Sequence, residues 1–244
     1  MITTPSARES ADGLAGIINI VLKKGADSGL NLKLTSGIGT KRYTYGIDGN
    51  YNLSFLNFRL VASKSARRMD SRQSLNRVYE DGSTENIFTP YNFDGRVYRI
   101  ATGLDVFLDE KNVLSFDVNY TEDTHDFFNN SAYTGTRNGD FLYLRESQHF
   151  HYITNVNGNF RHTFQKPEHF LEIDYNLNEN DNFFPATDSR EGVFLQDENY
   201  DYDNTLQALS LDYTNPVNRF MTLESGISWN HRKLVSAFDF EDVQ

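Results

Sequence analysis

The chain has 244 residues, with 23 Lys and Arg against 34 Asp and Glu, 19 Phe, 14 Tyr and no Cys. The absence of Cys excludes disulfide scaffolds and thiolate metal sites, and the aromatic content excludes a disordered or collagen-like chain. The net charge of -11 argues against a nucleic-acid partner, because clustered Lys and Arg bind such partners.

The N-terminal 25 residues differ in character from the rest of the chain. Gly13 and Gly16 permit a tight bend, and residues 17–22 form a nearly continuous apolar run suited to burial on both faces. No run reaches the roughly 18 apolar residues of a transmembrane helix, and residues 1–10 lack the features of a secretory signal. We therefore interpret residues 1–25 as the end of a separate packed domain, and we expect any export signal to lie upstream.

From residue 26 onward, apolar and polar residues alternate with a period of two, which is typical of strands with one apolar and one wet face. The alternation is clearest in residues 114–121 and 171–178. It predicts an all-β domain at residues 26–244. The nine predicted strands lie around residues 30–38, 43–53, 56–62, 98–108, 114–121, 150–164, 171–178, 209–213 and 221–229.

The connections between these strands alternate between short and long. Short turns are predicted near Ser54 and at residues 109–111, 165–168 and 215–218. Long polar connections are predicted at residues 69–92, 127–146 and 183–200. An antiparallel up-and-down meander with tight turns at one rim and long loops at the other produces this pattern, as outer-membrane barrels do. The turn near Lys41 is expected on the side of the long loops.

Alternation alone fits two architectures. A soluble sandwich packs two apolar faces together, whereas a membrane barrel turns its apolar face to lipid and its polar face to the lumen. The strands are longer than usual, and aromatic residues recur near their ends, which favours the barrel. These residues are Tyr43, Tyr98, Tyr120, Tyr213, Phe220 and Trp229. We predict a partial transmembrane β-barrel, with a secreted β-sandwich binding module as the alternative.

A short motif joins the N-terminal segment to the meander. Pro-Ser-Ala-Arg at residues 5–8 is followed by Gly-x-x-Gly-Ile-Ile-Asn-Ile and then by Lys-Lys at residues 23–24. The central residues of the motif are Gly13, Gly16, Ile17, Ile18, Asn19 and Ile20. This motif resembles the last strand of the plug domain in TonB-dependent receptors of the Bacteroidetes type. The resemblance implies a barrel of 22 strands, so we interpret the chain as a fragment with the plug terminus and about nine barrel strands.

The resemblance also implies a location and a function. It implies residence in the cell outer membrane and uptake of a ligand such as a siderophore or a glycan through a lumen that the plug gates. The implied partners are outer-membrane lipid, the TonB complex acting through the full-length protein, a surface lipoprotein and a small-molecule or oligosaccharide ligand, with no cofactor. A passive outer-membrane porin is a second alternative, against which the plug-like motif counts. No catalytic motif is present, so no enzyme activity is expected.

Four residues form the best candidate for a metal site. His149 and His151 share one face of a strand, as Asp123 and His125 do on the preceding strand. A hairpin register that pairs His125 with His149 also pairs Asp123 with His151, on the polar face near the loop rim. Imidazole and carboxylate groups together suit a divalent ion, whereas the alternative is a set of water-solvated lumen residues.

Two charge clusters suggest further binding sites. An acidic cluster is dense enough in oxygen atoms for Ca²⁺, although its spacing is not that of an EF-hand and a solvated surface is the alternative. Its members are Asp197, Glu198, Asp201 and Asp203. A basic cluster suits contact with anionic lipopolysaccharide or another anion, or simple charge balance with nearby acids. Its members are Lys64, Arg67, Arg68, Arg72 and Arg77.

Overall fold

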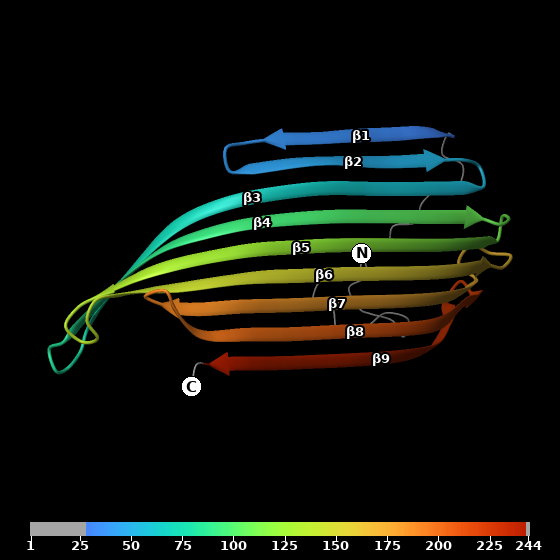
Figure 1. The fold of residues 1–244 in the computed structure, drawn as a ribbon. Helices are drawn as coiled ribbons and strands as arrows, with labels where there is room; N and C mark the ends of the chain where they lie inside the picture. Colours follow the sequence, from blue (N-terminus) through green and yellow to red (C-terminus); the bar gives the residue numbers. More distant parts are fainter. Residues whose placement is uncertain (1–27, 243–244) are drawn as a thin grey trace.

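The computed structural model describes residues 28–242, which form one antiparallel sheet of nine strands in sequential order (Figure 1). The strands are β1 (Gly29–Ile38), β2 (Arg42–Asn52), β3 (Leu56–Val78), β4 (Thr84–Phe107), β5 (Asn112–Thr134), β6 (Phe141–Thr163), β7 (Phe170–Arg190), β8 (Val193–Asn218) and β9 (Met221–Asp242). The prediction of an all-β up-and-down meander is confirmed for these residues. A search of the same residues finds no helix able to span a membrane.

At one end of the sheet, here called the turn end, short connections close to the predicted ones join β2 to β3, β4 to β5, β6 to β7 and β8 to β9. Asp109 shapes one of these turns, because its carboxylate accepts hydrogen bonds from the backbone N–H groups of Lys111 and Asn112. The turn predicted at residues 215–218 is wrong by a few residues, since β8 continues to Asn218. Pro216 has no N–H to donate, and the pairing of β8 with β9 is irregular immediately after it.

At the opposite end, here called the loop end, the structure corrects a larger error in the sequence prediction. Residues 69–92, 127–146 and 183–200 lie mostly in extended strands, and only a few residues at the centre of each range form the connection. The first connection is closed by hydrogen bonds from the Tyr79 N–H to the Ser83 carbonyl and from the Gly82 N–H to the Tyr79 carbonyl. Polar residues occur on both faces of the sheet here, so the alternation of apolar and polar residues is weak, although the backbone ladder continues.

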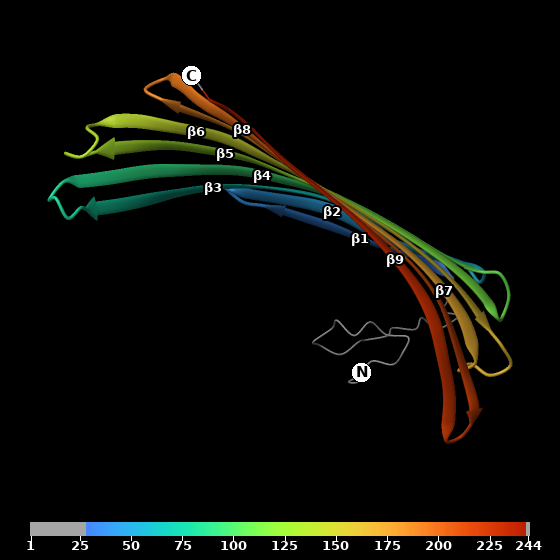
Figure 2. The ribbon, with the colours of Figure 1, turned by 90° about the horizontal axis from the view of Figure 1, so that it is seen from below.

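The sheet forms a single twisted and curved layer (Figure 2). Within residues 28–242 only three hydrophobic side chains are buried, those of Phe93, Phe170 and Ala186. Large apolar side chains such as Leu34, Ile100 and Trp229 are instead exposed. The described residues therefore do not form the two packed layers of a sandwich.

The sheet is open. Within residues 28–242, contacts between strands join only sequential neighbours, so β1 and β9 do not meet. Each edge strand therefore has backbone N–H and C=O groups without a neighbouring strand, which are ready to pair with another chain.

We expect the purified chain to self-associate in buffer without detergent, because it exposes two strand edges and a wide apolar face. Sedimentation velocity should show large species without detergent and a single small species in a mild nonionic detergent. A monodisperse monomer in detergent-free buffer would contradict this expectation.

Candidate functional site

The strand register assigns each side chain to one of two faces, because directly paired residues of neighbouring strands point to the same side. We call one side the apolar face and define it by a row of paired residues that crosses five strands. The row consists of Leu34, Ile47, Ala62, Ile100 and Tyr120. We call the other side the polar face.

On the apolar face, apolar residues form a band that starts at the turn end and stops partway along each strand. Its limit toward the loop end descends across the sheet, through Tyr43, Tyr98, Tyr120, Leu177 and Leu209. Relative to the row of paired residues that contains Tyr98, Tyr43 lies two positions toward the loop end and Leu209 lies six positions toward the turn end. Strand β6 is an exception, since its limit lies higher.

This descent corresponds to a definite angle. Eight positions along a strand are about 26 Å, and the six strand spacings from β2 to β8 are about 29 Å. Within the sheet, the limit of the band therefore makes an angle of roughly 40° with the direction perpendicular to the strands. The turns descend in parallel, from Asn52 at the end of β2 to Asn218 at the end of β8. The band therefore keeps a nearly constant height of about nine positions, or about 23 Å across the tilted strands. Strands of membrane barrels tilt by about 35–45°, with an apolar band of about 25 Å.

Tyrosines mark the upper limit of this band. Tyr45, Tyr98 and Tyr152 share one row of paired residues, and Tyr120 lies two positions nearer the turn end. Lys64 lies between two of them, with its ammonium nitrogen 4.5 Å from the centre of the Tyr98 ring. Tyrosine rings and long basic side chains favour the boundary between hydrocarbon and water. Tyr98, Tyr120 and Tyr152 lie in mid-strand, because β4, β5 and β6 continue far beyond the band, whereas Tyr45 lies near the loop end of the shorter β2.

At the level of the band, the polar face carries a network of charged groups. Arg59 binds two carboxylates, those of Asp105 and Asp117, and Asp105 also accepts hydrogen bonds from the Asn57 amide and another side chain. Asp105 is buried, so its charge depends on these partners. Gly103 lies directly beneath the network, where a Cβ atom would come within 2.7 Å of Arg59 Nη2.

Replacing Gly103 by Ala should displace the Arg59 guanidinium and destabilise the fold by about 1–3 kcal/mol. Thermal unfolding in detergent, followed by circular dichroism, measures this effect. Gly158→Ala is the matched control, because a Cβ atom there meets nothing within 4 Å and should change stability little. Equal unfolding temperatures for the two variants would show that the network does not depend on the glycine.

Toward the loop end, the polar face carries a group of rings that we call the aromatic-histidine wall. It comprises Phe93, His125, Phe127, His149, His151 and Phe184, from strands β4 to β7. The His149 and Phe184 rings stack at 3.9 Å, and the Phe93 and His125 rings meet edge to face at 4.8 Å. The predicted register is confirmed, because His125 pairs with His149 and Asp123 with His151.

The imidazoles of this wall bind protein groups. His125 Nε2 contacts the Asp123 carboxylate, whereas His149 and His151 lie 3.2 and 2.9 Å from the side-chain oxygens of Asn182 and Asn180. Burial lowers the pKa of His125 and the neighbouring His149 lowers it further, although Asp123 opposes this shift. His125 is therefore neutral at pH 7 and presents hydrogen-bonding atoms without charge.

The structure gives metal binding no geometric support. Among the described residues, no group of three or more His, Asp or Glu side chains is placed to hold a metal ion. Binding by Asp123, His125, His149 and His151 thus stays a prediction, and the proposals below do not use it.

The register divides both predicted charge clusters between the two faces. In the acidic cluster, Asp197, Asp201 and Asp203 lie on the apolar face, whereas Glu198 lies on the polar face and binds Arg145. In the basic cluster, Arg67 and Arg77 lie on the polar face. Lys64, Arg68 and Arg72 lie on the apolar face. Alternation along a strand separates residues that are close in sequence.

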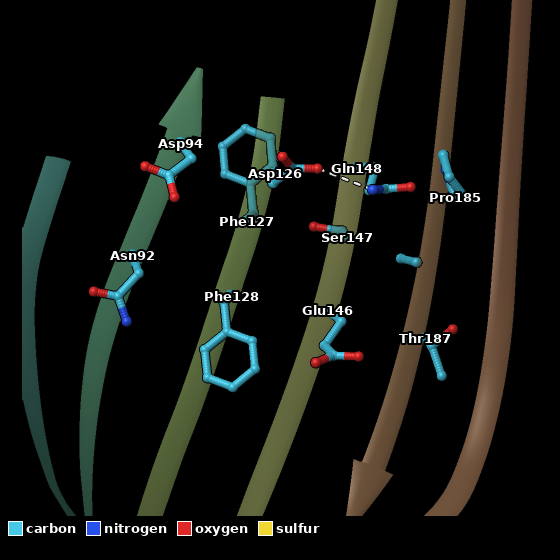
Figure 3. A pocket seen from close by; sticks show the side chains of 11 residues that line it. Asn92, Asp94, Asp126, Phe127, Phe128, Glu146, Ser147, Gln148, Pro185 and Thr187 are labelled. Carbon is cyan, nitrogen blue, oxygen red and sulfur yellow. Dashed lines mark hydrogen bonds between the residues drawn. The ribbon is translucent and has the colours of Figure 1, made fainter. Parts of the chain in front are cut away.

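Sequence reasoning missed two adjoining depressions on the apolar face, loopward of the band. One, of about 440 Å³, is drawn in Figure 3, where Asp126 accepts a hydrogen bond from Gln148. The other, of about 380 Å³, lies over β2 to β5 and shares Asp94 and Asp126 with the first. Each is assembled from several strands, so no local sequence signal indicates it.

Comparison with known proteins adds no assignment. No family model, curated protein or solved structure matches the chain. The motif at Gly13, Gly16, Ile17, Ile18, Asn19 and Ile20 lies outside the described residues.

Proposed function

We propose that the chain is the N-terminal part of an outer-membrane barrel, from a TonB-dependent receptor that takes up a small-molecule or oligosaccharide ligand. The observation that carries the proposal is the oblique apolar band, whose height and tilt fit a strand wall in a bilayer. The plug-like motif at residues 13–20 favours a receptor over a passive porin. In the full-length protein, the TonB complex and a surface lipoprotein are the proposed partners.

The two faces support this orientation by their chemistry. Hydrocarbon offers no partners to backbone amides, so only a closed sheet spans a bilayer as strands, with its apolar side chains outward. The polar face then lines the lumen, where water solvates groups such as the Arg59 network. The open edges at β1 and β9 are where further strands of the barrel would pair.

The aromatic-histidine wall is the proposed contact surface for the ligand. His125 lies five positions loopward of Tyr120 along β5, or about 16 Å beyond the limit of the apolar band. A ligand entering from the loop end would therefore meet these rings before it reaches the level of the membrane. Aromatic rings and imidazoles offer stacking and hydrogen bonding together.

Trp229, the only tryptophan, provides an internal test of the proposed membrane face. It lies on the apolar face within the band, paired with Leu209. When the chain is folded into phosphatidylcholine vesicles, we expect bromine atoms on the acyl chains to quench its fluorescence strongly, because contact with the bromine is required. Steady-state fluorescence in brominated and ordinary vesicles measures this.

The matched control moves the tryptophan to the other face at nearly the same level, as Trp229→Phe combined with Ala208→Trp. Ala208 lies on the polar face of β8, one position from Leu209, so a tryptophan there should be quenched much less. Equal quenching at the two positions, or none at Trp229, would overturn the assignment of the apolar face to lipid.

A further inference from the structure

An apolar hollow interrupts the band on the apolar face of β1 to β4. Its volume is about 590 Å³, and its floor lies at Ala62, whose side chain is much smaller than its neighbours. The walls on this face are formed by Leu34, Tyr45, Ile47, Tyr98 and Ile100, with Lys64 at the loopward side. A methyl group surrounded by large side chains leaves a groove of the kind that an acyl chain fills.

The depression of about 380 Å³ lies immediately loopward of this hollow, and the two share strands β2 to β4. Ala66 is in its floor, four positions from Ala62 along β3, or about 13 Å. Lys41, Arg68 and Arg96 surround it.

These three cations keep capacity for a further anion. Each is paired with one aspartate, at 2.8 Å for Lys41, 2.8 Å for Arg68 and 2.9 Å for Arg96. Their side chains nevertheless remain 57%, 66% and 51% exposed. By contrast, Arg59 and Arg145 on the polar face each bind two carboxylates and are only 32% and 35% exposed. Guanidinium groups bind phosphate in charge-assisted pairs, so the exposed donors suit a phosphate.

We propose that this surface binds one phosphorylated glycolipid, with an acyl chain in the hollow at Ala62 and a phosphate at Lys41, Arg68 and Arg96. The inference rests on the proposed function, which turns this face to lipid. The hollow alone suits any acyl chain, and the cations alone suit any anion. The hollow and the cations adjoin each other on opposite sides of the row that contains Tyr45 and Tyr98. This arrangement selects an amphiphile whose headgroup and acyl chain meet at that row.

The adjoining depression of Figure 3 accounts for the sugar part of the headgroup. It continues from Asp94 and Asp126 and presents the polar side chains of Asn92, Gln148 and Thr187. Side-chain amides both donate hydrogen bonds to hydroxyls and accept hydrogen bonds from them, and carboxylates accept hydrogen bonds from hydroxyls. A phosphate lobe beside a hydroxyl-binding lobe fits a phosphorylated sugar better than it fits a simple phosphodiester headgroup.

The test uses the full chain in a neutral detergent with three probes, namely lipid A, enzymatically dephosphorylated lipid A and inorganic phosphate. Native mass spectrometry and calorimetry measure binding. We expect lipid A to bind at least about tenfold more tightly than its dephosphorylated form, since the charge-assisted bonds are lost. Inorganic phosphate should not compete at millimolar concentration. Equal binding of the two lipids, or full competition by free phosphate, would overturn the proposal.

Two pairs of variants localise the site. K41Q/R68Q/R96Q should weaken lipid A binding at least about tenfold, whereas R161Q/R190Q/R232Q removes three charges from the polar face and should change it less than about twofold. A62F fills the hollow and should weaken binding, whereas V156F adds the same ring elsewhere in the band and should not. Circular dichroism confirms that each variant keeps its strands, and the single variant R96Q serves if the triple variant unfolds.

The outcomes separate this inference from the proposed function. Quenching of Trp229 without phosphate-selective binding leaves the membrane assignment standing and overturns only the lipid site. Equal losses in the two triple variants indicate a general charge effect and also overturn the site.

Discussion

Lateral backbone hydrogen bonding is the constraint on which this structure depends. The strands pair only with their sequential neighbours, and within residues 28–242 no second layer covers either face. A sheet of this kind cannot gain stability by burying one face against another of its own. The surroundings of each face must therefore match the chemistry of its side chains. The difference between the two faces thus indicates that they contact different environments.

The two faces differ in composition and also in geometry. On the apolar face, the limit of the band and the turns descend together across the sheet, which keeps the band at one height. Random clustering of apolar residues would not follow a line oblique to the strands. On the polar face, charged and amide groups are bound to one another, as Arg59 is to Asp105 and Asp117.

The sequence predicted the features that depend on local alternation. The number of strands, their order and the pairing of His125 with His149 follow from period-two patterns and turn positions. The extension of β3 to β8 through residues 69–92, 127–146 and 183–200 was missed, because polar residues on both faces weaken the alternation that marks a strand. The hollow at Ala62 was missed for another reason, since its walls come from three other strands and its shape depends on their register. Neither function nor ligand is settled by alternation, because many functions share one fold.

The long hydrogen-bonded strands that continue loopward of Tyr120 have a mechanical consequence. Strand β5 continues 14 residues past Tyr120, or about 46 Å, before a connection of only six residues leads into β6. A hydrogen-bonded sheet of this height, with so short a connection, has little freedom to bend over a bound molecule. Under the proposed function, a ligand that approaches the loop end would meet a surface already in its final shape, and little conformational entropy would be lost on contact.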